Sequence, residues 1–210
     1  MKLYQFPVSH YSAKVHIVLL EKGLSFEAPE LTWAFLKSPE FLAINPLGKV
    51  PYLQDGDFGI GESEVIVEYL EERYPQPAML PTSIEARARC RWLSRFHDMY
   101  LGPQLSTLYF ALSDGRAAQP GFQIEVDRLH QLIGMLEAQI APAPYFLGHQ
   151  FTLADASYAV SYLYIGKLSS AHGKPVARSA MPRLADWFDA VKIRPSVAAV
   201  LAATEAALAN

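Results

Sequence analysis

Glu62 and Ser63 are candidate ligand-binding residues because they immediately precede an apolar helical face. A helix is predicted over Glu62–Tyr74, with one apolar face made of Val65, Ile66, Tyr69 and Leu70. Free N–H groups and the helix dipole at such a start favour an anion. Ser63 is equally able to act as a helix cap that needs no ligand. The pair therefore indicates either an anion-binding position or a plain cap.

A second polar cluster lies near the beginning of the chain, where Ser9, His10, Tyr11 and Ser12 precede an apolar segment. Ser12 is predicted to cap a helix over Ala13–Lys22. Donor groups beside a helix start can stabilise a negatively charged ligand atom. His10 is also consistent with a solvated loop residue, and Tyr11 with packing against a second part of the molecule.

A third unusual feature is the Val50-Pro51 step within the segment NPLGKVPYL, which covers Asn45–Leu53. Proline has no N–H to give to a central strand, so its place at a strand entry calls for an explanation. An ordinary turn at an edge strand, with a trans proline, is one such explanation.

Composition excludes other kinds of chemistry. Cys90 is the only cysteine, which excludes an internal disulfide and a cysteine-rich metal site. The six histidines show no metal-ligand spacing, so no metal is expected. A net charge of -3 argues against nucleic acid as the main partner. No apolar run approaches the ~20 residues that span a bilayer or resembles a signal peptide, so a soluble, cytoplasmic protein that does not enter membranes is expected.

Strand and helix signals alternate in the elements that would position these residues. Four strands are predicted, at Lys2–Phe6, Leu24–Glu30, Val50–Gln54 and Phe58–Gly61. Asp55-Gly56 joins the last two as a hairpin. With the two helices above and a weakly helical Phe35–Ile44, the order is βαβαββα.

Prolines at 75, 77 and 81 then crowd a stretch that favours neither helix nor central strand, so Gln76–Ser83 is predicted as a domain boundary. The charge balance is -5 before Gln76 and +2 from Gln76 onward. Beyond the boundary the signals are helical, at Ile84–Ser113 (bent near Gly102-Pro103), Phe122–Ile140, Thr152–Ser169, Pro182–Ile193 and Ser196–Leu208. Asp155 completes a capping box with Thr152, which is a folding role.

This order, over essentially the whole chain, resembles the cytosolic glutathione S-transferases with a bacterial-like, serine-type first loop. The resemblance implies an α/β plus all-α fold. Residues 1–76 would form a thioredoxin-like glutathione-binding domain, and residues 84–210 an all-helical domain that contributes the electrophile site. It also implies a homodimer active in detoxification. The helix that begins at Ile84 usually lines the dimer interface, and its basic stripe (Arg87, Arg91 and Arg95) is either a solvated face or a docking surface for the partner's acidic domain.

The resemblance assigns glutathione recognition to the motifs quoted above. Pro51 would be cis, which leaves the Val50 N–H and C=O free to bind the cysteinyl backbone of glutathione. Ser63 would donate to the γ-glutamyl carboxylate, and Glu62 would accept from the ammonium group. Lys49 and Lys37 lie near the expected glycyl carboxylate, although Lys37 is equally consistent with a solvated surface role.

Ser9 aligns with the catalytic serine of this family. A thiol with a pKa near ~8.5 is only slightly ionised at neutral pH, and lowering that pKa by about two units requires roughly 2.7 kcal/mol. A hydroxyl donor beside a helix N-terminus can supply this stabilisation. Where zeta-like enzymes have Ser-Ser-Cys-Ser, this chain has Ser9-His10-Tyr11-Ser12. His10 and Tyr11 therefore remain alternative activators, and Ser12 a possible contact.

The implied reaction is conjugation of glutathione, as co-substrate, to a small hydrophobic electrophile. The electrophile site is expected between the first loop and the long helix, at Phe6, Tyr100, Gln104 and Tyr109. Glutathione-dependent isomerase or peroxidase activity is one alternative. A non-catalytic binding protein that keeps the fold is another.

Overall fold

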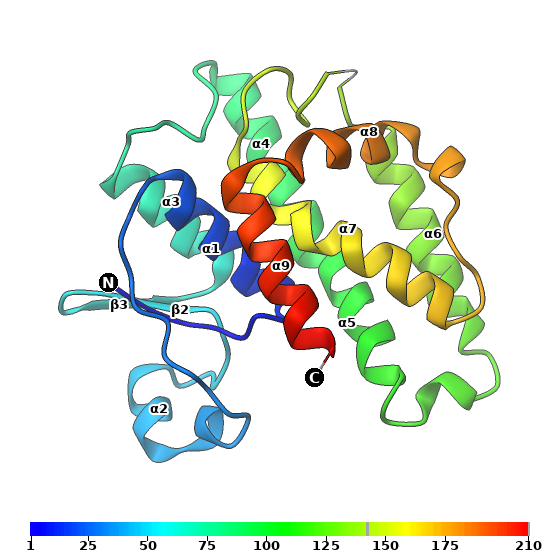
Figure 1. Ribbon diagram of the computed structural model, residues 1–210, viewed down its shortest axis with the longest axis horizontal. Coiled ribbons are helices and arrows are strands. Elements are labelled where there is room, and N and C mark those ends of the chain that lie inside the picture. The colour runs from blue at the N-terminus through cyan, green and yellow to red at the C-terminus, as the bar shows by residue number, and fades with distance from the viewer. Residues whose placement is uncertain (142, 210) are drawn as a thin grey trace.

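The computed structural model describes residues 1–141 and 143–209. A small sheet and α2 (Pro39–Ile44) lie on one side of the molecule, and the helices α4 to α9 gather on the other (Figure 1). The predicted combination of an α/β part with an all-helical part is confirmed.

The sheet has three strands in the order β1-β2-β3, with both pairs antiparallel. These are β1 (Lys2–Tyr4), β2 (Tyr52–Asp55) and β3 (Phe58–Gly61). The β2–β3 hairpin was predicted, and its register pairs Asp55 with Phe58. The predicted strand at Leu24–Glu30 is wrong, because only a parallel bridge between Lys2 and Glu27 forms there. Pro29, which has no N–H, follows two residues later and ends any further pairing.

One helix, α1, follows β1 in the sequence, and another, α3, follows β3. α1 covers His10–Glu21 and therefore starts three residues earlier than predicted, while α3 covers Ser63–Arg73. A single 3-10 turn, η1 (Phe35–Lys37), precedes α2, whose cap Ser38 accepts a hydrogen bond from Phe41 N at 3.1 Å. α1 therefore begins after the loop that follows β1, and α3 begins just after β3.

The long helix predicted from Ile84 to Ser113 is divided by a π-helical turn. α4 (Ile84–Phe96) continues through η2 (His97–Leu101) into α5 (Gly102–Ala111). The irregularity thus begins five residues before the predicted bend at Gly102. The other regular elements of this part are η3 (Arg116–Ala118), α6 (Gln123–Glu137), α7 (Leu153–Ala171), η4 (Arg178–Ala180), α8 (Pro182–Val191) and α9 (Pro195–Ala209).

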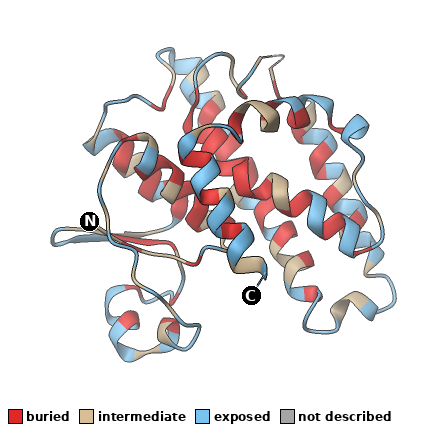
Figure 2. Cartoon of the chain, in the orientation of Figure 1, coloured by how far each residue is buried: buried red, intermediate tan, exposed pale blue. Residues whose placement is uncertain are grey.

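The main core does not stop at the predicted domain boundary. It joins Leu3, Ile17 and Ile66 from the first part to Leu93 and Trp187 from the second. α1 packs against α7, and α7 is buried along most of its length, as the red segments in Figure 2 show. At the start of α7, Asp155 accepts hydrogen bonds from Thr152 N and Oγ1, Phe146 N and Trp187 Nε1, so the predicted capping box is confirmed.

Candidate active site

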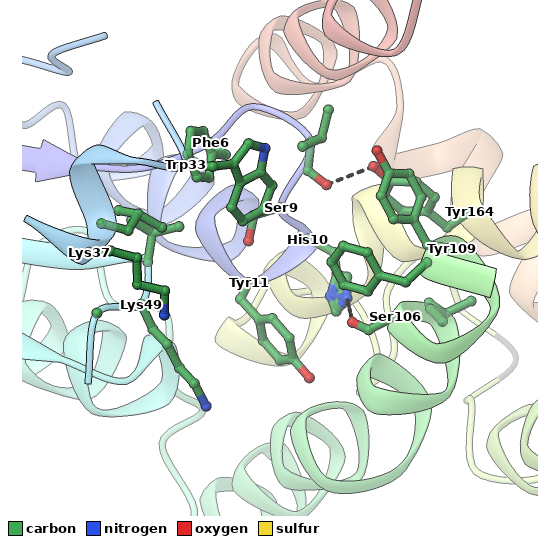
Figure 3. Close-up of a pocket in the computed structure, with 16 residues that line it drawn as sticks. Phe6, Ser9, His10, Tyr11, Trp33, Lys37, Lys49, Ser106, Tyr109 and Tyr164 are labelled. Atoms are coloured by element: carbon green, nitrogen blue, oxygen red, sulfur yellow. Dashed lines mark hydrogen bonds between the residues drawn. The ribbon is translucent and has the colours of Figure 1, made fainter. Parts of the chain in front are cut away.

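A largely apolar cavity of about 370 Å³ lies where the first loop, the segment before α2, and α5 meet. Its walls carry the side chains of Phe6, Trp33, Leu36, Leu105, Tyr109 and Phe110. In Figure 3, Lys37 and Lys49 lie on one side of this cavity and Ser106, Tyr109 and Tyr164 on the other. Its size and apolar walls suit a small organic molecule.

A second, more polar cavity of about 400 Å³ adjoins the first. Tyr11, Lys49 and Val50 line both cavities, so the two share a wall. The second cavity is further lined by Asn45, Pro51, Glu62, Ser63, Arg95 and Asp98. The two cavities together offer a polar compartment beside an apolar one.

Ser9 is the N-cap of α1, and its Oγ accepts a hydrogen bond from Ser12 N at 3.2 Å. Ser9 lines the first cavity, and because its oxygen acts as acceptor in the cap, its hydroxyl hydrogen stays available as a donor. The prediction that Ser12 caps this helix is therefore wrong. The Ser12 hydroxyl is buried and lines neither cavity, so Ser12 does not belong to the site by its side chain.

His10 and Tyr11 also line the first cavity, from the first turn of α1. Burial, together with the neighbouring His97, holds the pKa of His10 well below its usual value, so its imidazole is neutral. Burial, and then the charges of Asp98 and Glu62, raise the pKa of Tyr11. Tyr11 is thus a protonated phenol and can donate a hydrogen bond, but cannot serve as a base near neutral pH.

The Val50-Pro51 peptide bond is cis, as the resemblance predicted. Val50 lies before β2, and within residues 1–141 and 143–209 neither its N–H nor its C=O has a hydrogen-bond partner. Next to it, Asn45 Nδ2 donates to Lys49 O at 2.7 Å and holds the loop. A free backbone donor and acceptor therefore border both cavities.

Glu62 is the N-cap of α3 and has φ 66°, the one positive value outside glycine in the described part of the chain. A non-glycine residue held in this region is strained, and such residues concentrate at functional sites. Ser63 begins α3, and its Oγ lies 3.4 Å from Asp98 Oδ2. Residues 62–65, which form this helix start, line the second cavity, and the first N–H groups of a helix have no partner within it.

A buried cluster of charged side chains lies behind the wall of the second cavity. It was not predicted from the sequence. Lys14 Nζ, on α1, lies 2.7 Å from Asp98 Oδ1 and 2.9 Å from Glu64 Oε2. Burial acts to raise the pKa of Asp98, but the hydrogen bond from His97 and the charge of Lys14 outweigh it and hold that pKa below its usual value. Glu64 Oε2 contacts Lys14 Nζ, and burial raises the pKa of Glu64. Asp98 is thus a fixed negative charge at the second cavity.

Two of the four residues predicted for the electrophile site do not line the first cavity. Phe6 and Tyr109 line the first cavity, but Tyr100 and Gln104 do not. Gln104 Nε2 donates to Glu125 O at 2.8 Å and so points to α6, while Tyr100 lies on the exposed side of η2 against Phe96. The predictions included a bend near Gly102-Pro103 but no π-helical turn before it. The π-helical turn shifts the phase of the helix, and the cavity side of α5 consists of Leu105, Ser106, Tyr109 and Phe110.

The matched family models cover both parts of the chain. A model described as the N-terminal domain of glutathione S-transferase matches residues 3–78, and one described as its C-terminal domain matches residues 85–190. The chain belongs to the glutathione S-transferase family. Members of this family bind glutathione.

Similar proteins include glutathione S-transferase 3 of Zea mays, which is 33% identical over 97% of this chain and 94% of its own length. A glutathione S-transferase of Pseudomonas putida is 32% identical over 99% of this chain and 94% of its own length. A stringent starvation protein A homolog of Coxiella burnetii is 33% identical, over 76% and 73%.

Solved structures agree with this assignment. That of glutathione S-transferase III in its apo form is 30% identical, with a TM-score of 0.78, and covers 97% of this chain and 96% of its own. A zeta-class bacterial maleyl pyruvate isomerase is 25% identical, with a TM-score of 0.80 over 97% and 98%.

Other kinds of site find no support in the described part of the chain. No group of three or more metal-ligating side chains gathers between residues 1 and 141 or between 143 and 209. Nor do these residues include a helix long and apolar enough to cross a membrane.

Proposed function

We propose that this transferase ionises glutathione with Ser9 and conjugates its sulfur to a small hydrophobic electrophile. The observation that carries the proposal is the position of Ser9, which caps α1 and lines the apolar cavity with its hydroxyl hydrogen unused. The γ-glutamyl end of glutathione would occupy the second cavity, beside Glu62 and Ser63. The Val50 N–H and C=O would bind the cysteinyl backbone in the manner of an added strand.

The glycyl carboxylate would then lie near Lys37 and Lys49. Both lysines line the first cavity on its side opposite α5, and the Nζ of Lys37 lies close to Gly48. Two cations near a carboxylate favour its binding through charge-assisted hydrogen bonds. This arrangement directs the sulfur of glutathione to the mouth of the apolar cavity, next to Ser9.

The chemical step needs the thiolate, because the neutral thiol is a poor nucleophile. A hydrogen bond from Ser9 and the positive end of the α1 dipole stabilise the thiolate selectively. Lowering the thiol pKa by about two units requires roughly 2.7 kcal/mol, which one charge-assisted hydrogen bond and the dipole can supply together. The thiol proton leaves to solvent, and the thiolate sulfur forms a bond to the electrophilic carbon. In a substitution the bond from that carbon to its leaving group breaks, and the leaving group departs with the electron pair; in an addition the electron pair of the double bond moves away from that carbon.

Calorimetric titration with glutathione, combined with a pH profile of conjugation, tests this proposal. We expect binding in the millimolar range or tighter for the wild type. Ser9→Ala should keep most of the binding but raise the apparent pKa of the bound thiol and lower kcat at neutral pH by on the order of 100-fold. Ser113→Ala, which removes an exposed hydroxyl just after α5, is the matched control.

Absence of glutathione binding would refute the proposal. Binding without turnover of 1-chloro-2,4-dinitrobenzene or benzyl chloride, with no effect of Ser9→Ala on the bound thiol, would instead favour a non-catalytic binding protein. The similarity to a stringent starvation protein A homolog motivates that second candidate. The similarity to a maleyl pyruvate isomerase motivates a third, isomerisation in the same site, which product analysis separates from conjugation.

We further propose that the protein acts in the cytoplasm in detoxification and forms a homodimer. Trp92, Met99 and Val65 are large apolar side chains that are exposed in this chain. Arg91 of the basic stripe of α4 already pairs with Glu68 of its own chain, at 2.8 Å, so a partner's acidic domain would have to use Arg87 and Arg95. Sedimentation equilibrium tests the dimer, and a monomer at micromolar concentration would contradict it.

A further inference from the structure

Ser106 and His10 form a polar pair on the otherwise apolar side of the first cavity. His10 Nε2 lies 3.3 Å from Ser106 Oγ, and Figure 3 shows the contact at the cavity wall that α5 provides. Ser106 is partly exposed, on the face of α5 that it shares with Tyr109. The glutathione contacts proposed above use neither residue, so the pair is free for the second substrate.

Neighbouring rings hold the imidazole of His10 in place. Its centroid lies 4.2 Å from that of Tyr11, 5.4 Å from that of His97 and 6.2 Å from that of Tyr164. Gly102 at the start of α5 makes room for the ring in this orientation, because a Cβ there would lie 3.0 Å from His10 Cε1. A buried, neutral imidazole carries one N–H and one bare nitrogen.

The hydrogen-bond partners decide which nitrogen carries the proton. His10 Nδ1 is buried and has no partner among the described residues. A proton on Nδ1 would be a buried donor without an acceptor, which is rare and costly. We therefore assign the proton to Nε2, where it donates to Ser106 Oγ. The hydroxyl hydrogen of Ser106 is then left to point into the cavity.

We propose that Ser106 is a catalytic residue of the electrophile site that donates this hydrogen to an oxygen of the electrophile, and that His10 is the residue that positions it. This inference rests on the proposed conjugation activity. The matching electrophile has an apolar or aromatic body for the walls formed by Leu105, Tyr109 and Phe110, and a carbonyl oxygen for Ser106. An α,β-unsaturated ketone or aldehyde has both.

The step balances without a further reactant. The thiolate sulfur forms a bond to the β-carbon, and the electron pair of the carbon–carbon double bond moves toward the carbonyl, whose oxygen becomes an enolate. A hydrogen bond from Ser106 is strongest at that stage, when the oxygen carries the negative charge. The α-carbon then takes a proton from water, which replaces the proton that the thiol released.

A comparison of two electrophiles tests the assignment. Benzylideneacetone has the carbonyl oxygen, whereas benzyl chloride has a similar aromatic body and no oxygen. In Ser106→Ala we expect kcat/KM for the enone to fall at least about tenfold more than for benzyl chloride. Ser106→Thr, which keeps a hydroxyl, should restore most of the difference. Thr107→Val is the matched control, because Thr107 lies on the same helix and lines neither cavity.

His10→Phe tests the positioning role. It should produce the same selective loss for the enone while the calorimetric Kd of glutathione and the ultraviolet-monitored pKa of its bound thiol stay as in the wild type. Equal losses for both electrophiles, no loss in Ser106→Ala, or a wild type that does not convert the enone would overturn the assignment. In each of these cases, conjugation of benzyl chloride by the wild type would still support the proposed conjugation activity. A wild type that binds no glutathione would contradict both that activity and the role of Ser106.

Discussion

Lys14 brings a positive charge into the interior where α1 meets α3 and η2. Its ammonium group is fully buried and contacts two carboxylates, Asp98 and Glu64. Asp98 borders the second cavity next to Ser63. Removal of the cation would leave both carboxylates buried without a counter-charge, which is far costlier than the loss of an exposed ion pair. Lys14 therefore supports the proposed glutathione site without lining it.

Lys14→Met should lower the free energy of unfolding by about 3–5 kcal/mol at pH 7. Without Lys14 the folded-state pKa values of Asp98 and Glu64 both rise, because the cation that lowers them is gone. The carboxylates then bind protons more readily in the folded state, so the destabilisation should shrink as the pH falls from 7 to 5. Urea unfolding at both pH values measures this. Lys192→Met, at an exposed pair, is the control, and a loss that is equal at both pH values would contradict the account.

The sequence alone identifies those candidate site residues that lie next to the start of a helix or strand. Ser9, Val50, Glu62 and Ser63 could be singled out because each stands beside a helix or strand boundary that local signals reveal. Asp98 and Ser106 could not, because their orientation depends on the helix phase beyond η2, and no local signal marks a π-helical turn. Only the spacing of Ser106 and Tyr109, three residues apart on one helix, hinted at a common face.

The junction of η2 and α5 shows how one element positions another. A Cβ at Gly102 would lie 2.7 Å from Tyr11 Oη and 3.0 Å from His10 Cε1, closer than real contacts allow. The first turn of α1 approaches α5 closely because this position has no side chain. The segment Leu24–Glu30 shows the opposite case, in which neighbouring elements prevent a structure that the local sequence favours. Its residues are typical of a strand, but it forms only a single bridge because no neighbouring strand pairs with it further.

Gly102→Ala should destabilise the protein and lower kcat/KM, because Tyr11 and His10 must move away from the cavity wall. Helix propensity alone predicts the opposite, a gain of about 0.5–1 kcal/mol. Gly134→Ala is the matched control, since this glycine lies within α6 and a Cβ there meets nothing within 4 Å. Thermal unfolding and the kinetics of both variants provide the measurement. Equal stabilisation by both substitutions would refute the close approach.

The whole molecule has one main core, although its sequence predicts two domains. That core contains residues from both sides of the stretch Gln76–Ser83, and further contacts join the two parts. Arg194, just before α9, binds Glu21 of α1 through two nitrogens at 3.0 and 2.6 Å. The predicted division describes composition and charge well, but composition cannot reveal that α1 uses α7 as its packing partner.

We therefore expect a single cooperative unfolding transition for the chain. Trp33 reports on the first part and Trp187 on the second, so variants that lack Trp92 and retain only one of these two tryptophans can be followed by fluorescence in urea. Within each variant, the fluorescence midpoint should coincide with the midpoint followed by far-ultraviolet circular dichroism, and glutathione should shift both by the same amount. Two separate midpoints within one variant would show that the two parts unfold independently.

The first loop is tied to parts of the chain that lie far beyond it. Thr204 Oγ1, on α9, donates to Pro7 O at 2.9 Å, and Tyr164 Oη, on α7, donates to Val8 O at 2.7 Å. Both acceptors directly precede Ser9. A ribosome must therefore translate almost 200 residues beyond the loop before its backbone acquires these anchors. The turn at Ser63 needs no contact from α9, whereas the loop that holds Ser9 is anchored only after α9 has been made. During synthesis, the part of the site proposed to activate the thiol would thus be the later of the two to acquire its support.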